Sequence, residues 1–373
     1  MNVPALDLPA QFREVEVEVR AALDRVLAAQ RFILGAEGEA LEREIAAYSG
    51  ARHAVGVSSG TDAILVALMA IGVGAGDEVV TTPYTFLATA TSIARLGARA
   101  VFVDIEAETY ALNPALLEAA IGPKTRAIIP VHLFGQMANA AAIQKIANAH
   151  DIPVLDDAAQ AIGARRNDVP VGRGSLAATL SFFPSKNLGG AGDGGMVLTN
   201  DADFAERVRR LRNQGQTTKY TSEIVGGNFR LDELQAAILR AKLPRLDAWT
   251  FARQEHARAY RDAFAKRSLA RDLLALPHEA PRVRHVYNQF VIRTPRREAL
   301  RRHLTNRGIA SAVYYPLPMH LQPCFAPWGY RVGDFPESEL AAAETLALPL
   351  YPELAPGAID FVVDVVTAFL GRA

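Results

Sequence analysis

The stretch SFFPSKNLGGAGDGGMVLTN, residues 181–200, guides the interpretation of the whole chain. It places Lys186 between an apolar run that ends at Phe183 and a glycine-dense loop, and a strand pattern follows at 195–199. Surface lysines usually have polar neighbours, whereas the small and apolar neighbours here let a ligand approach the backbone. Partial desolvation lowers the pKa of a lysine amine and makes it a nucleophile. The stretch therefore favours a lysine that forms a Schiff base with a carbonyl compound, for which pyridoxal phosphate (PLP) is the natural candidate.

Composition narrows the possible classes of protein. The 373 residues are 50% hydrophobic and 21% charged, which suits a large globular core with a second, smaller domain. Forty basic residues balance forty acidic ones, which argues against nucleic acid or a membrane surface as the main partner. Cys324 is the single cysteine, so an internal disulfide and a cysteine metal cluster are excluded. Because the sequence has neither a signal-peptide pattern nor an apolar run of transmembrane length, we expect a cytoplasmic protein.

Strand and helix patterns alternate through the first part of the chain. Buried strands are predicted at 53–57, 78–82, 98–103, 127–131 and 154–156. Helices are predicted at about 15–29, 37–49, 61–71, 114–120 and 139–150, with one more beginning near Phe86. This alternation predicts an α/β domain with a mostly parallel central sheet. Ligands of such sheets bind at the carboxyl ends of the strands, where the candidate site residues are Thr61, Phe86, Asp157, Gln160 and Lys186.

A pyridine ring with a phosphate gives each of these residues a use. Asp157 can keep the ring nitrogen protonated, Phe86 can stack on the ring, and Gln160 can hydrogen-bond the phenolate oxygen. Ser181 and Thr61 can bind the phosphate, Thr61 from a helix N-terminus. Taken singly, Asp157 is better explained as a helix cap and Phe86 as a core residue. One ligand, however, accounts for all of them together.

Six segments, in this order and spacing, resemble the DegT/DnrJ/EryC1/StrS family of sugar aminotransferases: VSSGTDAIL, PYTFLATA, IPVHLFGQ, VLDDAAQAIGA, SFFPSKNLGGAGDGGMVLT and GGNFRLDELQAAIL. The resemblance covers nearly the whole chain. It implies a PLP-dependent enzyme of the aspartate-aminotransferase fold (fold type I) that acts on nucleotide-linked keto-sugars. It also implies a homodimer with active sites at the interface. We expect a large PLP-binding domain over residues 1–245 and a smaller C-terminal α+β domain over 246–373, which includes a bridging helix.

Carried over to the matching positions, the resemblance assigns roles to individual residues. Lys186 is the Schiff-base lysine, Asp157 the partner of the ring nitrogen, and Gln160 a phenolate contact. Phe86 covers the ring. The implied phosphate contacts are Gly60, Thr61 and Ser181.

Two residues of the segment GGNFRLDE receive roles that involve the partner subunit or the substrate. The resemblance implies that Asn228 reaches the phosphate bound to the neighbouring subunit and that Arg230 faces the substrate. From sequence alone, Asn228 would be read as a turn former. For Arg230, a sugar carboxylate, a hydroxyl group and a phosphate all stay open as partners.

The C-terminal part carries the expected specificity. The segment VYYPLPMHLQPCF, residues 313–325, resembles the one with which family members that aminate the sugar carbon C-3 enclose the hexose. Members that act on C-4 usually differ here. The implied substrate contacts are Tyr314, Tyr315, His320 and Gln322. A proline-rich loop with a surface histidine is the alternative, and His320 has no second ligand at metal-binding spacing.

The remaining elements form the expected bridge and the small α+β unit. A helix is predicted at 231–239 and a long bridging helix at 244–267, with apolar residues Leu246, Trp249, Tyr260 and Phe264. Strands are predicted at 286–293 and 310–313, and helices at 296–307, 337–346 and 358–370. We interpret the arginines at 296–302 as a solvated helix face.

The expected reaction is the transfer of an amino group from L-glutamate to a dTDP- or UDP-linked 3-keto-hexose, with ping-pong kinetics. A C-4 keto-sugar or another cyclic ketone is the alternative acceptor. A non-catalytic regulator is the least favoured reading, because it has no use for Lys186, Asp157 and Ser181. The segment GGAGDGG partly resembles a dinucleotide fingerprint but precedes a strand rather than a helix, so NAD is discounted.

Overall fold

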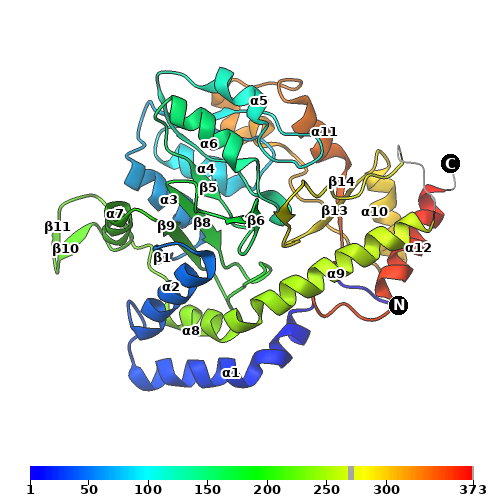
Figure 1. Ribbon diagram of the computed structural model, residues 1–373, viewed down its shortest axis with the longest axis horizontal. Helices are drawn as coiled ribbons and strands as arrows, with labels where there is room; N and C mark the ends of the chain where they lie inside the picture. The colour runs from blue at the N-terminus through cyan, green and yellow to red at the C-terminus, as the bar shows by residue number, and fades with distance from the viewer. Residues whose placement is uncertain (268–272, 372–373) are drawn as a thin grey trace.

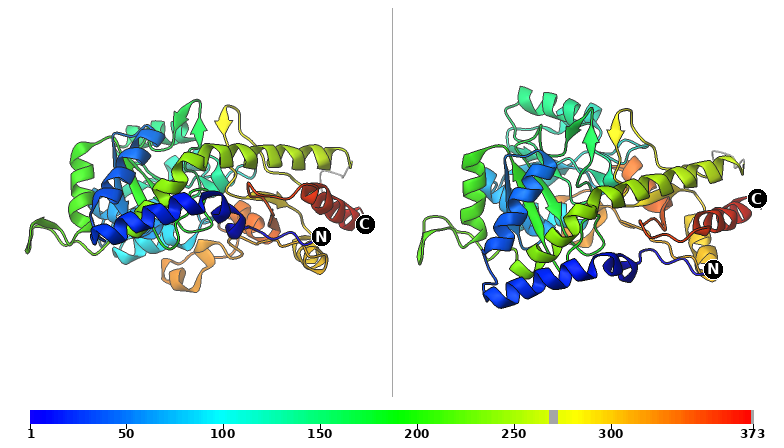
Figure 2. Two further views of the ribbon diagram at one scale, coloured as in Figure 1. Left: turned by 90° about the horizontal axis from the view of Figure 1, so that it is seen from below. Right: turned by 60° about the horizontal axis from the view of Figure 1, so that its bottom comes forward.

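The computed structural model describes residues 1–267 and 273–371. Figure 1 shows a larger part, with a central sheet between helices, and a smaller part beside which both chain ends lie. Helix α9 (Leu246–Ala265) runs from the larger part to the smaller one, and Figure 2 shows helix α1 (Leu8–Ala29) on the lower side of the molecule. Within the described ranges, no helix is both long enough and apolar enough to cross a membrane.

The central sheet consists of two sections joined by isolated bridges. The first section is parallel throughout and has the order β3 (Arg99–Phe102), β2 (Glu78–Thr81), β4 (Thr125–Ile128). The second has the order β1 (His53–Val57), β9 (Gly195–Thr199), β8 (Ala177–Ser181), β5 (Leu155–Asp157). Parallel bridges Ile128–Val154 and Val131–Asp157 connect the two sections. Because β9 is antiparallel to β1 and β8, the sheet is mixed, although most of its strand pairs are parallel.

The strands are apolar on both faces because helices cover both sides. One face packs on α3 (Gly60–Ile71), α4 (Leu87–Arg95) and α7 (Ala202–Arg212). The opposite face packs on α2 (Ala36–Ser49), α6 (Ala140–Ala149) and α8 (Glu233–Lys242). In β8, Ala177 faces the first layer, whereas Ala178 and Leu180 face the second, as the two-residue period of a strand requires. A short helix, α5 (Pro114–Leu117), precedes β4.

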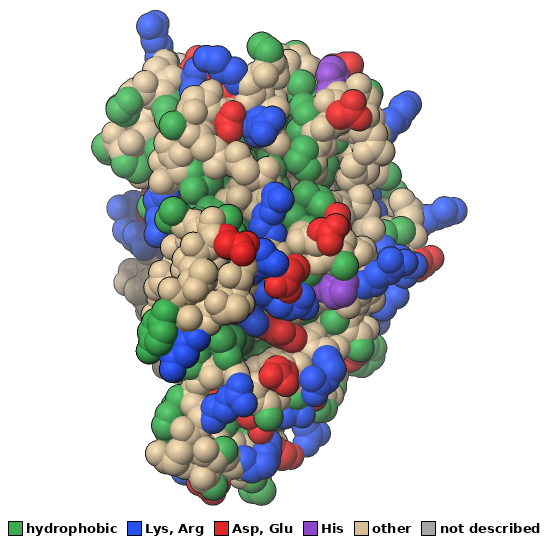
Figure 3. Space-filling model, turned by 90° about the vertical axis from the view of Figure 1, so that its left-hand side faces the viewer, with side chains coloured by type: hydrophobic (Ala, Val, Ile, Leu, Met, Phe, Trp, Pro, Cys, Tyr) green, Lys and Arg blue, Asp and Glu red, His purple; other side chains and the backbone are tan. Residues whose placement is uncertain are grey.

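Short antiparallel strand pairs lie outside the central sheet. Strands β6 (Arg165–Arg166) and β7 (Val169–Pro170) pair with each other, and β6 also pairs with β12 (Val283–Arg284). A separate hairpin, β10 (Gln216–Thr218) and β11 (Thr221–Ser222), projects at the left of Figure 1. Figure 3 views this side of the molecule, where basic and acidic side chains lie next to one another. Arg210 of α7 forms ion pairs with Glu206 of the same helix at 3.4 Å and with Glu223, just after β11, at 3.3 Å.

The smaller part has its own core around a two-stranded antiparallel ladder, β13 (Phe290–Arg293) and β14 (Thr345–Leu348). Helices α10 (Arg297–Asn306) and α12 (Ala358–Leu370) pack on it together with the end of α9. The predicted apolar face of α9 is confirmed, because Leu246, Trp249, Tyr260 and Phe264 are all buried. The chain also returns to the larger part, since Met319, Phe325 and Phe335 join the core of α3 and α4. The division at residue 245 therefore stays a prediction.

Some expectations for the C-terminal part are wrong. Residues 310–313 form no strand and contribute only the bridge Ala312–Ala347. Helix α11 (Pro336–Glu344) ends before the predicted residue 346, because Thr345 turns into β14. An apolar run as short as TLAL has no periodicity that separates a buried helix from a buried strand. The arginine face of α10 is not wholly solvated either, since Arg297 is buried and donates from Nη1 to the Ala342 carbonyl at 3.1 Å.

Glu233 at the start of α8 holds the start of α2 in place. Its buried carboxylate accepts hydrogen bonds from the backbone N–H groups of Gly35, Glu37 and Gly38 at 2.9, 2.8 and 3.0 Å. We expect Glu233→Ala to leave these donors without acceptors and to lower the free energy of unfolding by about 3 kcal/mol, measured by urea denaturation. Glu39→Ala, in the exposed part of the same turn, is the control and should change it by less than about 0.5 kcal/mol. An equal effect of the two substitutions would contradict the capping role.

Candidate active site

A cavity of about 420 Å³ lies at the carboxyl edge of the sheet. Its walls come from the start of α3, the start of α4, the turn after β5, the end of β8 and the loop that follows β8. The predicted site residues that line it are Gly60, Thr61, Phe86, Asp157, Gln160, Ser181, Lys186, Tyr314 and Tyr315. Residues that are far apart in the sequence are thus brought to one cavity, as expected for a sheet with ligands at its strand ends.

Asp157 and Lys186 are the charged pair of the cavity. The Asp157 carboxylate is buried and accepts hydrogen bonds from Thr89 Oγ1 at 2.8 Å and from the Ala159 N–H at 3.2 Å. Burial raises the pKa of Asp157, against the effect of these hydrogen bonds and of the Lys186 charge. Burial lowers the pKa of Lys186 to about 8, although the Asp157 charge opposes this. A neutral amine is therefore accessible near physiological pH, beside a carboxylate that favours a positively charged partner.

The N-terminus of α3 lies where the phosphate cup is predicted. Ser59 caps this helix, because its Oγ accepts a hydrogen bond from the Asp62 N–H at 3.0 Å, and Gly60 and Thr61 begin the first turn. A Cβ atom on Gly60 would lie 2.6 Å from the Ser181 Cβ, so only glycine lets α3 approach the end of β8 this closely. A helix N-terminus with hydroxyl groups on both sides is a suitable site for an anion.

The close approach at Gly60 leads to a test of the cup. We expect Gly60→Ala to push α3 away from Ser181 and to raise the dissociation constant of PLP about tenfold or more, corresponding to about 1.4 kcal/mol. Fluorescence titration of the cofactor-free protein measures this constant. Gly74→Ala is the matched control, because a Cβ atom there would meet nothing within 4 Å. Unchanged PLP affinity in Gly60→Ala would argue against a phosphate site at α3.

Gln160 and Tyr315 form a rigid wall of the cavity. Gln160 accepts from the Phe134 N–H at 2.6 Å and donates to the Tyr315 hydroxyl at 2.7 Å. The Tyr315 ring stacks on Phe134 at 6.3 Å and meets Tyr84 edge-on at 5.6 Å, and burial raises the pKa of its hydroxyl. Tyr315 also has a left-handed backbone with φ 57°, which is uncommon for an aromatic residue. These contacts hold the Tyr315 side chain in place at the wall of the cavity, which Tyr314 also lines.

The structure does not bring four predicted residues to the cavity of this chain. Asn228 is exposed, and Arg230 donates from Nη1 to the Asn213 amide oxygen at 2.9 Å. Their predicted roles involve a partner subunit or a substrate and stay predictions.

His320 is not a surface residue but is buried, with Nε2 3.1 Å from Glu339 Oε1 and its ring edge-on to Phe335. Gln322 donates to the Leu317 carbonyl at 3.1 Å. His320 and Gln322 therefore support the 313–325 segment from outside the cavity.

Other cavity residues were missed by the sequence analysis. His132 and Gln289 line the cavity, and Thr89 binds the Asp157 carboxylate from one turn beyond Phe86. His132 and Thr89 lie inside the quoted segments IPVHLFGQ and PYTFLATA, so position within a motif was the available signal. Gln289 comes from a strand pattern of the small unit and gave no such signal. No group of three or more metal-binding side chains is present in the described part of the chain.

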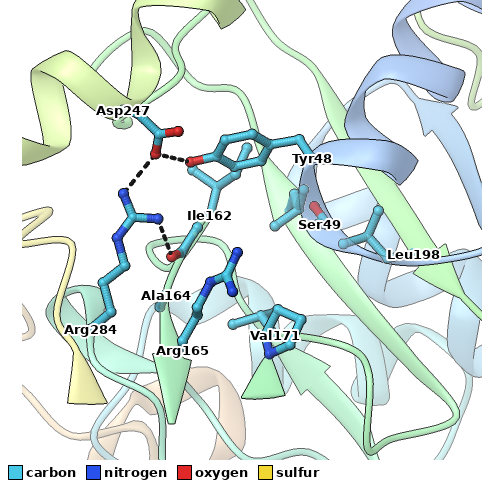
Figure 4. A pocket seen from close by; sticks show the side chains of 12 residues that line it. Tyr48, Ser49, Ile162, Ala164, Arg165, Val171, Leu198, Asp247 and Arg284 are labelled. Carbon is cyan, nitrogen blue, oxygen red and sulfur yellow. Dashed lines mark hydrogen bonds and ion pairs between the residues drawn. The ribbon is translucent and has the colours of Figure 1, made fainter. Parts of the chain in front are cut away.

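A second cavity, of about 190 Å³, has a structural network at its rim (Figure 4). Tyr48 donates to Asp247 at 3.0 Å, and Arg284 donates to the same carboxylate at 2.6 Å and to the Gly163 carbonyl at 3.2 Å. The hydrogen bond from Arg284 lowers the pKa of Asp247. These bonds join α2, α9 and β12. This cavity shares no lining residue with the one around Lys186.

The family profile described as "DegT/DnrJ/EryC1/StrS aminotransferase family" matches residues 13–367. The chain belongs to this aminotransferase family. It is 51% identical over 369 residues to a protein of Geobacillus stearothermophilus named "Pleiotropic regulatory protein", covering 99% of each chain. It is 43% identical to the "dTDP-3-amino-3,4,6-trideoxy-alpha-D-glucose transaminase" of Streptomyces venezuelae, covering 100% of this chain and 97% of that one. It is 44% identical to the "UDP-N-acetyl-3-dehydro-alpha-D-glucosamine 3-aminotranferase" of Acidithiobacillus ferrooxidans, covering 94% of each chain.

Solved structures of family members confirm the predicted aspartate-aminotransferase-like fold. The DesV protein of S. venezuelae superimposes with a TM-score of 0.96 at 42% identity, covering 100% of this chain and 99% of that one. The NtdA protein of Bacillus subtilis, solved with the bound cofactor PMP, superimposes with a TM-score of 0.93 at 29% identity, covering 100% of this chain and 86% of that one. The expected family and fold are therefore correct, and the chain is an aminotransferase of a PLP-dependent family.

Proposed function

We propose that this aminotransferase moves the amino group of L-glutamate to a nucleotide-linked 3-keto-hexose, a dTDP- or UDP-sugar, and releases a 3-amino sugar nucleotide. The observation that carries the proposal is that Lys186 and Asp157 face one cavity that Tyr314 and Tyr315 close on the side of the predicted sugar. The names of the S. venezuelae and A. ferrooxidans relatives support the acceptor class and leave both nucleotides open.

The residues of the cavity fit pyridoxal phosphate. Asp157 offers a buried carboxylate for the ring nitrogen, and Gly60 lets the N-terminus of α3 lie close to Ser181, so that its free amide groups could bind the phosphate. Phe86 lies at the start of α4 and Gln160 in the turn after β5, and both line the cavity that would hold the ring. When bound, PLP supplies an aldehyde and a ring that withdraws electrons from the carbon next to the amine.

Each side chain of the site has a role in this proposal. Lys186 would attach the cofactor through its neutral amine and, once released, would carry a proton between the α-carbon of the amino donor and the cofactor. Asp157 would lie against the ring nitrogen, where a positive charge favours the ionised carboxylate against the effect of burial. Gln160, which is held by Phe134 and Tyr315, would contact the phenolate oxygen of the ring. Because donor and acceptor would react in turn at the same site, ping-pong kinetics are expected.

The proposal includes a homodimer with shared active sites. Phe86 and Phe183 line the cavity and yet are 60% and 53% exposed. Tyr220 and Val225, in the segment that leads to Asn228, are 86% and 89% exposed. Exposed aromatic and aliphatic side chains of this size indicate a protein interface. Analytical ultracentrifugation is expected to give a dimer that Val225→Asp weakens, and a monomeric wild type with full activity would contradict the shared site.

An absorbance spectrum of the purified protein tests the reaction. With PLP bound, we expect a band near the visible edge that shifts when L-glutamate is added and returns when a dTDP- or UDP-linked 3-keto-hexose follows. Restoration by only one nucleotide would identify the nucleotide. The same series with a 4-keto sugar nucleotide and with a free cyclic ketone tests the two alternative acceptors.

Each failure in this series has a distinct meaning. A wild-type protein that shows no band after PLP is supplied would contradict the catalytic proposal. A band that shifts with L-glutamate but returns with no sugar nucleotide would contradict the acceptor class, and the donor half of the proposal would stand. A band that returns only with the 4-keto sugar would overturn the choice of C-3.

A further inference from the structure

The loop that carries Lys186 is anchored by α8, which does not line the cavity. Two side chains of this helix make the contacts. Lys242 donates from Nζ to the Gly189 carbonyl at 2.6 Å, and the Gln235 amide oxygen accepts from the Ala191 N–H at 2.9 Å. Both contacts lie within five residues of Lys186 in the sequence. The loop is therefore held by contacts that lie outside the cavity.

Gly189 is in direct steric contact with the turn that contains Lys186. A Cβ atom on Gly189 would lie 2.3 Å from the Pro184 carbonyl oxygen, which leaves no free space between the two backbone segments. The turn itself is closed by a hydrogen bond from the Lys186 N–H to the Phe183 carbonyl at 2.8 Å. Because protein interiors are densely packed, a shift of the Gly189 carbonyl moves this turn as well. The Lys242 contact thus bears on the position of the Lys186 amine.

The environment of Lys242 is costly for an ammonium group. Its side chain is buried, and burial lowers its pKa to about 8, although Glu353 opposes this. Both carboxylate oxygens of Glu353 are buried without a hydrogen-bond partner among the described residues. Burial raises the pKa of Glu353, against the charge of Arg253, which is buried as well. An apolar side chain such as methionine would fill the Lys242 position without this desolvation.

Glu353 belongs to the C-terminal part of the chain, in the segment between β14 and α12. Arg253 of α9 donates to the Leu350 carbonyl of the same segment at 2.9 Å and to the Tyr287 carbonyl at 3.2 Å. The Lys242 ammonium therefore lies where α8, α9 and the C-terminal part meet. Among the described residues its side chain donates one hydrogen bond, to the loop that carries Lys186, and the opposite charge that acts on it is that of Glu353 in the C-terminal part.

We propose that Lys242 is a positioning residue for Lys186: its buried ammonium donates to the Gly189 carbonyl and thereby fixes the loop that carries Lys186. The inference rests on the proposed role of Lys186 as the reacting amine, and it does not depend on the identity of the sugar. Lys242 touches neither the cavity nor a reacting atom. It acts only through the backbone of the loop.

Hydrogen exchange with mass spectrometry, on the full chain with and without PLP, tests the proposal. The variants are Lys242→Met and the double variant Lys242→Met/Glu353→Gln, which removes both charges and so avoids an unpaired buried carboxylate. In both variants we expect backbone amides at 184–192 to exchange about tenfold faster or more, while those of β1 and α3 keep the wild-type rate. Lys145→Met, at an exposed position of α6, is the control and should leave every rate unchanged.

A kinetic measurement separates positioning from a loss of stability. The rate of the absorbance change at saturating L-glutamate is expected to fall about 100-fold in the double variant, because small displacements of a reacting group have effects of this size. The glutamate concentration for half-saturation should stay within about twofold, because the cavity wall is unchanged. Exchange at 184–192 within twofold of wild type in the double variant would overturn the proposal. Faster exchange over the whole chain would overturn it too, since the role would then be structural only.

The two proposals fail in different ways. If wild-type protein showed no response to L-glutamate, the proposed function would fail, and the exchange rates of the cofactor-free variants would still decide the role of Lys242. If wild type behaved as proposed and the loop of the double variant exchanged normally, only the positioning role would fail.

Discussion

Replacing Lys186 by alanine is expected to reduce amino transfer by about 10⁴-fold or more, because the substitution removes the nucleophile and the proton carrier together. The measurement is single-turnover absorbance with L-glutamate, followed by steady-state assay with the sugar nucleotide. The protein should stay folded, because Lys186 makes no side-chain hydrogen bond among the described contacts and its removal therefore leaves no partner unsatisfied. Lys124→Ala, at an exposed turn, is the matched control and should retain wild-type activity.

The same lysine predicts a pH dependence. Since burial lowers the pKa of Lys186 to about 8, the neutral amine becomes abundant as the pH rises through that value. The rate at which cofactor-free wild type captures PLP should therefore rise with pH, with a midpoint near 8, and Lys186→Ala should lack this component. A midpoint above pH 10, the range of an exposed lysine, would contradict a desolvated amine.

The second large effect is expected for Asp157→Asn, which keeps the shape of the side chain and removes its charge. A neutral amide cannot hold the ring nitrogen protonated, and loss of one such electrostatic contact lowers the rate by about 10³-fold. The measurement is the rate of the glutamate-dependent absorbance change in PLP-loaded protein. Asp203→Asn, at an exposed position in the first turn of α7, is the control and should react at the wild-type rate.

The same substitution, Asp157→Asn, is expected to lower the rate of the reaction but to raise the stability of the cofactor-free protein. Burial raises the pKa of Asp157 in the folded state, so the folded state disfavours the ionised form. Stability is therefore lost as the pH rises from about 4, the ordinary pKa of aspartate, through the raised value. Asp157→Asn has no charge to bury and should have a higher Tm than wild type at pH 7 in the absence of PLP. A lower Tm, or an unchanged rate with PLP, would contradict the assigned role.

Much of the larger part could be predicted because its strands are apolar throughout and bounded by turns. The strand at 53–57 has the predicted limits, as does the helix at 358–370 in the smaller part, and the site residues lie at the strand ends as α/β topology requires. The family resemblance added the roles of Lys186, Asp157 and Gln160, and the structure places all three on one cavity. Position along the chain was sufficient here because each residue lies at the end of a strand or within five residues after it.

The rest depended on contacts between distant residues. His320 and Gln322 do not line the cavity of this chain, and a loop has no period that tells which of its side chains face inward, so their contact with the substrate stays a prediction. Arg297 was assigned to a solvated face because its neighbours are charged, whereas the carbonyl of Ala342 gives it a buried acceptor. Lys242 gave no signal at all, since the Gly189 carbonyl that it binds lies more than fifty residues earlier.

Helix α1 and the residues before it connect the larger part of the molecule with the smaller one. Before the helix begins, Val3 pairs with the C-terminal part, donating to the Gly308 carbonyl and accepting from the Ala310 N–H, each at 2.9 Å. Along its length of about 33 Å, α1 packs Val15 and Val19 against Ile238 of α8 and Trp249 of α9. Helix α1 therefore links the two parts a further time, beside α9 and the returning segment of Met319 and Phe325. A displacement of the smaller part away from the larger one would have to bend α1 or break the two hydrogen bonds of Val3.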